Sequence, residues 1–338
     1  MTGLHSTPLR TRHRLARAGL MAVTAALATT TLAATSGTAA AERTPAGPAT
    51  VGRVVSGFEV PESSYWSPEN ASWFVSNYGG ASFDGGERDG DGFLSRLAPD
   101  GTVLDRHWLD GFDAPNGIRG WRGRLVVADA GRLVVIDVQT REIVREVPVP
   151  GALFLNDVAV DPRTGDAYVS DTGTDSIWRL RAGPASHRSR DRLGNGPLEL
   201  YLRTPVLEAP NGLLVDGHRL VVGTIGPGLD LATFQTREPG QLLTVDLRTR
   251  AISPFGSAGR IGALDGIERD RSGYLVSDIA TGRVLRVTGT DVTTLFELGQ
   301  GQAADIGFDA HRRLLGVPAL FGTTVTFTKI PRARKAQP

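Results

Sequence analysis

A repeated pair of short strands runs along most of the chain and constrains its fold more than any other feature. Six times a polar residue opens an apolar strand, and a second apolar strand ends 13 or 15 residues later. Successive opening residues are 40–55 residues apart, and they are Glu62, Asn116, Asn156, Asn211, Asp265 and Asp305. A repeat of this length built from short β-strands is typical of a β-propeller. We therefore predict an all-β, six-bladed β-propeller in which the six opening residues occupy equivalent places around one axis.

The first and last strand segments of the repeat region each lack a partner of their own. The sixth repeat has room for only three strands, the last at Thr323–Lys329, whereas Val51–Gly57 precedes the first repeat. We predict that Val51–Gly57 supplies the missing outer strand of the sixth blade. Closing the ring in this way would leave no open sheet edge.

The N-terminal segment has the pattern of a secretory signal peptide. Four arginines precede an apolar stretch from Ala18 to about Ala34, and Ala39-Ala40-Ala41 offers small residues for cleavage. We predict a signal peptide over residues 1–41, a Pro-rich leader over 42–50, the propeller over 51–330 and a flexible tail over 331–338. The expected protein is secreted and extracellular, with no membrane attachment after cleavage.

Charge and cysteine content narrow the possible partners. Loss of residues 1–41 would remove four arginines and no acidic residue, which takes the net charge from +1 to −3. A chain of this charge has no basic surface for nucleic acid. The absence of cysteine excludes a disulfide framework, so the core must supply the stability. We expect a monomer that acts on a small molecule.

Four of the opening residues form a set suited to a hard metal ion. Glu62 and Asp265 would bring two carboxylates to the axis, and Asn156 and Asn211 would bring two amide oxygens. An all-oxygen set suits Ca²⁺ best, with Mg²⁺ or Mn²⁺ possible, and suits Zn²⁺ less. The alternative is that these residues only form turns, because Asn-Gly and Asp-Gly are favoured in turns. We favour turn formation for Asn116 and Asp305 and metal binding for the other four.

The motifs around these four residues resemble those of the SMP-30/gluconolactonase/luciferin-regenerating-enzyme family. The resemblance covers residues 54 to 328, and the matching motifs occur in the same order and blades as in the family. They are Glu62-Ser63 with Trp66, Asn156-Asp157 with Val160-Asp161-Pro162, Asn211-Gly212-Leu213, and Asp265-Gly266-Ile267 with Asp270 and Gly273-Tyr274-Leu275.

The resemblance implies a divalent cation at the centre of the propeller and hydrolysis of a lactone or related ester. It makes Glu62, Asn211 and Asp265 the core metal ligands, and Asn156 would bind the metal directly or through the substrate. Asp265 would also be the general base that takes a proton from metal-bound water. The function expected from the resemblance is a secreted, metal-dependent, gluconolactonase-like hydrolase.

One departure from the family bears on the substrate. Sugar-lactone members of the family carry an arginine two positions before the third-blade asparagine, and this chain has Phe154 there. Phenylalanine cannot donate hydrogen bonds to sugar hydroxyls, so the substrate would be a more hydrophobic lactone or ester. Further aromatic residues either extend this apolar mouth or pack in the core, namely Tyr65, Trp66, Tyr78 and Phe321. The predicted substrate-binding residues are Asn156, Phe154, Tyr65 and Tyr78.

Two other functions remain open at this point. A non-catalytic propeller could bind a carbohydrate, peptide or cell-wall ligand through its long loops, Gly79–Gly92, Arg181–Tyr201 and Gly226–Pro239. A condensing propeller similar to strictosidine synthase would need a catalytic glutamate over an apolar pocket, and the motifs place none. The chain has no Gly-x-Ser-x-Gly motif, and His107, His218 and His311 are expected at the surface.

Overall fold

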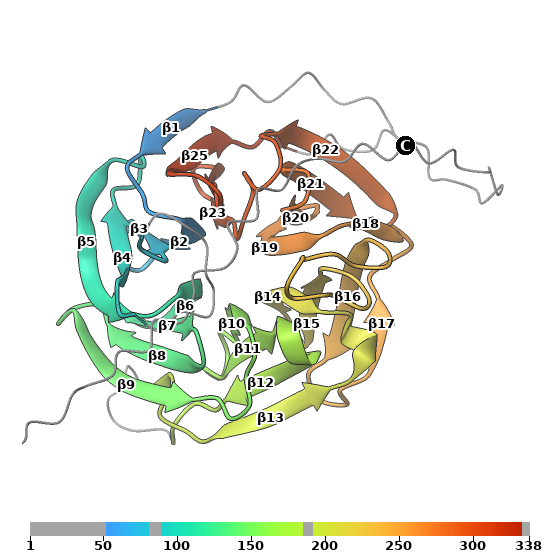
Figure 1. Cartoon of the computed structure of the whole chain (residues 1–338), viewed down its shortest axis with the longest axis horizontal. Coiled ribbons are helices and arrows are strands. Elements are labelled where there is room, and N and C mark those ends of the chain that lie inside the picture. Colours follow the sequence, from blue (N-terminus) through green and yellow to red (C-terminus); the bar gives the residue numbers. More distant parts are fainter. Residues whose placement is uncertain (1–51, 81–88, 185–191, 333–338) are drawn as a thin grey trace, which may run out of the picture. The chain divides into compact units, whose positions relative to one another are not determined.

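The described part of the chain is a closed ring of antiparallel sheets. The computed structural model describes residues 52–80, 89–184 and 192–332, and in this part six sheets surround one axis (Figure 1). The prediction of an all-β, six-bladed β-propeller is confirmed. Two short 3₁₀ turns accompany the strands, η1 (Thr172–Thr174) and η3 (Pro205–Leu207). No helix within these described ranges has both the length and the apolar character needed to cross a membrane.

Blades 1 to 5 are each built from strands that follow one another along the chain, from the axis outward, whereas β1 is the outer strand of blade 6. Blade 1 consists of β2 (Pro61–Ser67), β3 (Ser72–Asn77), β4 (Gly92–Leu97) and β5 (Val103–Phe112). Blade 2 consists of β6 (Pro115–Trp121), β7 (Arg124–Asp129), β8 (Arg132–Asp137) and β9 (Glu142–Pro148). Blade 3 consists of β10 (Leu155–Val160), β11 (Ala167–Asp171), β12 (Ser176–Leu180) and β13 (Leu198–Arg203).

The remaining blades follow the same plan with small variations. Blade 4 consists of β14 (Pro210–Asp216), β15 (Arg219–Thr224), β16 (Gly240–Asp246) and β17 (Ile252–Pro254), and β18 (Arg260–Gly262) also pairs with β16. Blade 5 consists of β19 (Leu264–Asp270), β20 (Gly273–Asp278), β21 (Arg283–Thr288) and β22 (Asp291–Glu297). Blade 6 consists of β23 (Gly307–Asp309), β24 (Leu314–Pro318), β25 (Thr324–Lys329) and β1 (Arg53–Ser56).

The ring closes through the first strand, as predicted. Strand β1 pairs antiparallel with β25, with Val55 opposite Val325. The inner strands also contact one another in sequence around the axis, and β23 contacts β2 to complete the circle. Closure therefore joins the two ends of the described chain in one blade and covers the edge of β25.

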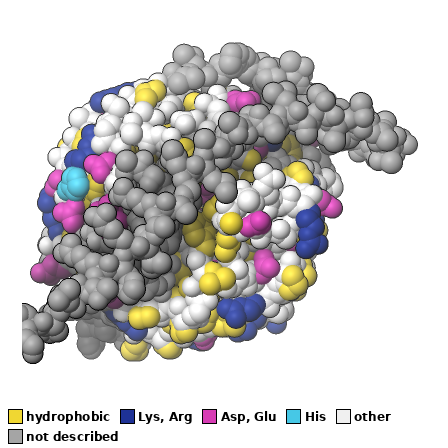
Figure 2. Space-filling model, viewed as in Figure 1, with side chains coloured by type: hydrophobic (Ala, Val, Ile, Leu, Met, Phe, Trp, Pro, Cys, Tyr) yellow, Lys and Arg dark blue, Asp and Glu magenta, His cyan; other side chains and the backbone are white. Residues whose placement is uncertain are grey.

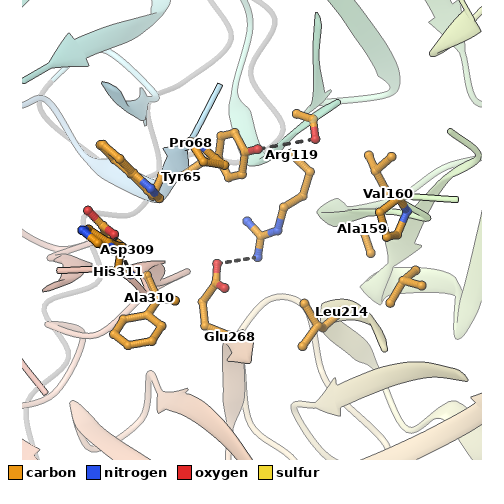
Figure 3. A pocket seen from close by; sticks show the side chains of 15 residues that line it. Tyr65, Pro68, Arg119, Ala159, Val160, Leu214, Glu268, Asp309, Ala310 and His311 are labelled. Carbon is orange, nitrogen blue, oxygen red and sulfur yellow. Dashed lines mark hydrogen bonds and ion pairs between the residues drawn. The ribbon is translucent and has the colours of Figure 1, made fainter. Parts of the chain in front are cut away.

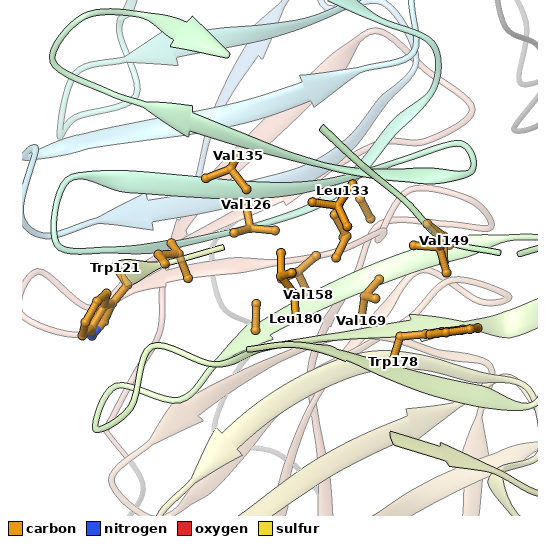
Figure 4. Packing of buried hydrophobic residues seen from close by; sticks show 14 residues of the cluster. Trp121, Val126, Leu133, Val135, Val149, Val158, Val169, Trp178 and Leu180 are labelled. Carbon is orange, nitrogen blue, oxygen red and sulfur yellow. The ribbon is translucent and has the colours of Figure 1, made fainter. Parts of the chain in front are cut away.

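The core lies between neighbouring blades. Each pair of adjacent blades encloses one cluster of buried apolar side chains, and the cluster between blades 2 and 3 is shown in Figure 4. In that cluster Val126 and Leu133 of blade 2 pack with Val158 and Val169 of blade 3. Burial of one such side chain contributes roughly 1.5–3 kcal/mol, so these clusters hold the six inner strands at fixed positions around the axis.

Five of the inner strands contain a β-bulge at the same place. In β10, for example, Leu155 pairs with Asp171 and Val158 pairs with Val169, so the inner strand has one residue more than its partner. The same shift follows the first residue of β2, β6, β14 and β19. Because side chains alternate along a strand, an inserted residue lets positions three apart face the same side. Both an opening residue and the residue three positions later can therefore point toward the axis.

The glycine after an opening residue provides space for the neighbouring blade. A Cβ atom on Gly212 would stand 1.7 Å from the carbonyl oxygen of Asp265, and one on Gly266 would stand 2.2 Å from the nitrogen of Ile306. Neither glycine has a positive φ, and both lie inside strands. The Asn211-Gly212 and Asp265-Gly266 pairs are therefore places of close approach between inner strands, and the alternative of turn formation is wrong for them.

Several predicted segments lie outside the described residues. The predicted signal peptide and leader fall in residues 1–51, and most of the predicted tail falls in 333–338. Residues 81–88 and 185–191 of two predicted long loops are also outside the described ranges. The chain direction assigns the loops to two ends of the axis: Gly79–Gly92 and Gly226–Pro239 connect second to third strands, where the inner strands begin. Arg181–Tyr201 overlaps the connection from β12 to β13 at the opposite end.

Candidate metal site and its surroundings

The four predicted metal ligands occupy the same position in four inner strands. Glu62, Asn156, Asn211 and Asp265 are each the second residue of β2, β10, β14 and β19. Their relative exposure is 3–5%. We call the end of the axis where the six opening residues lie the ring end, and the opposite end of the inner strands the far end.

Each of the four residues has a buried oxygen that lacks a hydrogen-bond donor. Within the described part of the chain, no donor reaches Glu62 Oε2, Asn156 Oδ1, Asn211 Oδ1 or Asp265 Oδ1. Buried polar atoms almost always have a partner, because leaving one without a partner costs about 1–3 kcal/mol. Four such oxygens in equivalent strand positions fit a bound cation, which would accept all of them as ligands. The residues present therefore suit the metal that the sequence motifs imply.

The two carboxylates alone are too few to hold a metal ion, and the two asparagine side chains would complete a set of four ligands. Among the described residues, no three His, Cys, Asp or Glu side chains form a group that could hold a metal ion. Glu62 and Asp265 are two carboxylates, so a four-oxygen set at this place requires Asn156 and Asn211. An oxygen-only set with two charges is suited to Ca²⁺ and excludes the soft ligands that select other metals.

Burial and mutual repulsion disfavour the charged forms of the carboxylates. Burial raises the pKa of Glu62 well above its ordinary value, and the nearby charges of Asp265, Asp305 and Asp157 raise it further. Burial, followed by Asp305 and Asp157, likewise raises the pKa of Asp265, and a hydrogen bond from Asn211 opposes this rise. A bound divalent cation would offset both effects, because a nearby opposite charge stabilises an ionised carboxylate.

The other two opening residues have partners within the protein. The side-chain nitrogen of Asn116 donates to the carbonyl oxygens of Ala114 (3.2 Å) and Leu155 (3.0 Å), and its oxygen accepts from Tyr78. Asp305 lies two residues before β23 and accepts hydrogen bonds from Ser63 and Arg119 through Oδ2. Its other carboxylate oxygen, Oδ1, has no hydrogen-bond donor among the described residues, as is the case for the four oxygens above. Both residues thus link inner strands of different blades, a role that differs from the turn formation we predicted.

Tyr78 is placed at the ring end, whereas Tyr65 is not. Tyr78 is 3% exposed, and burial followed by the charges of Glu62 and Asp265 raises the pKa of its hydroxyl. Tyr65 and Trp66 line a cavity at the far end instead (Figure 3). This corrects the expectation that Tyr65 and Trp66 share a mouth with Phe154. The physical reason is that Tyr65 follows Glu62 by three residues along β2, which carries it toward the other end of the strand.

Exposed apolar residues accompany Phe154 at the ring end. The rings of Phe154 and Phe234 lie 5.8 Å apart in an edge-to-face arrangement. Leu153, Leu231 and Phe234 have relative exposures of 63%, 36% and 44%. These residues come from the segment before β10 and from the Gly226–Pro239 loop, and Phe321 is also exposed. Figure 2 shows hydrophobic side chains reaching the surface near the middle of one face.

The three histidines expected at the surface, His107, His218 and His311, are exposed. His107 interacts with Asp110 at 2.8 Å and stacks on Phe93 in blade 1, away from the inner strands. His311 is exposed at the rim of the far-end cavity. That cavity also contains Arg119 and Glu268, two charged residues that the sequence analysis did not single out.

Comparison with known proteins supports the propeller fold and does not establish a function. No family model and no curated protein matches the chain. Among solved structures, a gluconolactonase from Xanthomonas campestris, described as important in glucose secondary metabolic pathways, is similar with a TM-score of 0.58. The match covers 85% of this chain and 99% of the gluconolactonase, at 19% sequence identity. At this identity the likeness establishes a common propeller fold.

Proposed function

We propose that this protein is a metal-dependent hydrolase of hydrophobic lactones or related esters. The observation that carries the proposal is the set of four buried oxygens without donors on Glu62, Asn156, Asn211 and Asp265. These side chains would hold one divalent cation, with Ca²⁺ preferred and Mg²⁺ or Mn²⁺ as alternatives. We further propose that the protein is secreted and acts as a monomer. The fold shared with a gluconolactonase is consistent with this function, although a fold alone never determines one.

In the proposed reaction, the cation and the side chains of the protein have different roles. When bound, the cation would polarise the carbonyl group of the ester and stabilise the negative charge that develops on it. Asp265 would accept the proton of the attacking water, because the cation would keep its carboxylate ionised at the place where the water is bound. Asn156 would orient the substrate beside Asp265.

The surroundings of the ring end favour an apolar substrate. Phe154 and Phe234 contact each other there, and Leu153 and Leu231 are exposed beside them. None of these side chains can pair with sugar hydroxyls, but each can bury an alkyl or aryl substituent. The expected substrate is therefore a lactone that carries an apolar chain.

Hydrolysis assays before and after chelation test this proposal. The purified protein should hydrolyse an alkyl-substituted γ-lactone faster than glucono-1,5-lactone, and EDTA should abolish the activity until Ca²⁺ is restored. Asp265→Asn should reduce the rate by about 10²–10⁴-fold, as expected for loss of a general base. The control is Asp309→Asn, which changes a buried carboxylate that is bonded to His311 and Arg312 outside the ring.

Two results would contradict the proposal. Hydrolysis that continues unchanged after EDTA treatment would exclude the metal. Absence of hydrolysis for every lactone and ester, in a protein that is folded and bound to Ca²⁺, would instead favour the alternative of a non-catalytic binding propeller.

A further inference from the structure

A cavity lies at the far end of the axis. It has a volume of about 400 Å³. Every inner strand contributes to its lining the residue that follows an opening residue by three positions, namely Tyr65, Arg119, Ala159, Leu214, Glu268 and Phe308. Residues of the turns after the inner strands, such as Pro68 and His311, complete the wall. The cavity is thus a regular product of the bulged inner strands, at the end opposite to the candidate metal site.

Arg119 lines this cavity, and one nitrogen of its guanidinium group has no hydrogen-bond acceptor among the described residues. The residue is 7% exposed, and its Nη1 donates to the carbonyl oxygen of Ile118 at 2.8 Å. Its Nη2 has no hydrogen-bond partner among the described residues. Leaving a buried charged donor without an acceptor costs free energy. An acceptor on a bound ligand would therefore stabilise this nitrogen.

Glu268 stands across from Arg119 without a direct hydrogen bond to it. Its Oε1 lies 3.7 Å from Arg119 Nη2, and the two side chains point toward each other in the cavity (Figure 3). This separation is too long for a direct hydrogen bond. A hydroxyl group beside both atoms, on the cavity side, could accept from Arg119 Nη2 and donate to Glu268, because one oxygen can do both. Burial, partly opposed by Arg119, raises the pKa of Glu268 to about 7.

The charges around Arg119 select against an anionic ligand. Three carboxylates lie near the guanidinium group: Asp305 at 3.5 Å, Glu268 at 3.7 Å and Asp157 at 3.9 Å. An added anion would face these charges with only one cation in compensation. An added cation would meet the guanidinium group and leave Nη2 without an acceptor. An uncharged polar group satisfies both residues without either conflict.

The rest of the cavity is mainly apolar, and its other polar residues are Tyr65, Asp309 and His311. Trp66, Leu214 and Phe308 are among its walls, and the other lining residues include alanine, valine and proline side chains. A cavity with a few convergent polar groups and apolar walls is the usual form of a small-molecule site. We propose that the far end binds a small, uncharged apolar alcohol, with its hydroxyl group hydrogen-bonded to both Arg119 and Glu268. This binding site is separate from the proposed hydrolytic site and does not depend on it.

Four probes of similar size test the chemical class. Benzyl alcohol, toluene, benzylamine and benzoate would each be titrated into the purified, Ca²⁺-loaded protein and followed by calorimetry. Benzyl alcohol should bind at least about tenfold more tightly than toluene, the effect expected for two hydrogen bonds. It should also bind more tightly than either charged probe. Equal binding of toluene would overturn the role of Arg119 and Glu268, and tighter binding of benzylamine or benzoate would overturn the uncharged class.

Two tryptophan substitutions locate the site. Leu214→Trp should fill the cavity and abolish binding of benzyl alcohol, while Ca²⁺ binding and lactone hydrolysis at the ring end persist. The matched control is Leu104→Trp on β5, where the leucine is 59% exposed and lies outside the cavity. Unchanged binding in Leu214→Trp would place the site elsewhere and overturn the proposal. Failure of all four probes to bind would show that the cavity holds only water and would overturn it equally.

Discussion

The ring end and the far end are built from the same inner strands but have opposite chemical characters. At the ring end, four strands present oxygens without donors, and burial and repulsion oppose the charges of Glu62 and Asp265. At the far end, three residues further along the chain, the strands present apolar side chains around one Arg119–Glu268 pair. The bulge in five of the inner strands lets both rows face the axis. The two proposed sites would thus use one set of strands for opposite chemistry.

The largest expected effect is a loss of lactone hydrolysis on substitution at the ring end, with almost no loss on substitution at the far end. Glu62→Ala removes one of the two ring carboxylates and should reduce lactone hydrolysis by at least about 10³-fold, within the range seen when a catalytic group is lost. Tyr65→Phe changes the far end of the same strand and should alter the rate by less than about threefold. The measurement is kcat/KM for both variants. A large loss in Tyr65→Phe would show that the two ends do not act independently.

The next effect concerns how closely the inner strands approach each other at the ring end. Gly212→Ala would place a Cβ atom 1.7 Å from the carbonyl oxygen of Asp265 and should destabilise the protein by about 3 kcal/mol or more. Gly217→Ala is the control, because it has a φ of +63° and no neighbouring atom within 4 Å. It should cost only about 1–2 kcal/mol through its left-handed backbone. Urea denaturation measures both, and equal losses would contradict the proposed close approach.

At the far end, Glu268 should make its own contribution to the pH dependence of stability. The folded-state pKa of Glu268 is about 7, above its ordinary value of 4.5, so the folded protein binds a proton that the unfolded chain has released. Stability should therefore fall as pH rises from about 4.5 to 7, by up to roughly 3 kcal/mol from this residue. Glu268→Gln should flatten this part of the profile. An identical pH profile in the variant would show that the residue is not desolvated as described.

The smallest effect tests the apolar surroundings of the ring end. Phe154→Arg should shift the preference between an alkyl-substituted lactone and glucono-1,5-lactone by about tenfold toward the polar substrate, a change of about 1.4 kcal/mol. The reason is that arginine can donate to hydroxyl groups and phenylalanine cannot. Leu104→Arg, at an exposed site on β5, is the control. An unchanged preference would show that Phe154 does not contact the substrate.

The repeat in the sequence was sufficient to predict the fold. The regular spacing of the opening residues indicated six blades, and the unpaired Val51–Gly57 segment indicated closure, which the pairing of β1 with β25 confirms. The same repeat predicted that Glu62, Asn156, Asn211 and Asp265 occupy equivalent positions in their strands, and each is the second residue of an inner strand. These features follow from strand patterns and chain order, which are local properties.

The far end could not be predicted because it depends on the bulges and on long-range contacts. Without the bulge, strand alternation would not place Tyr65 and Glu62 on the same side. Arg119 meets Asp157, Glu268 and Asp305, which belong to three other blades. A signal was nevertheless present, because counting three residues on from every opening residue finds the far-end row, including Arg119 and Glu268.

The most direct test of the central claim is a thermal unfolding experiment with and without a divalent cation. After removal of metals with EDTA, Ca²⁺ at one hundred times its dissociation constant should stabilise the protein by about 2.7 kcal/mol and raise Tm. The Asp309→Asn control should respond in the same way, and neither Glu62→Gln nor Asp265→Asn should respond. If no divalent cation raises the Tm of the unmodified protein, or if both ring variants respond as it does, the four oxygens at the ring end are not a metal site.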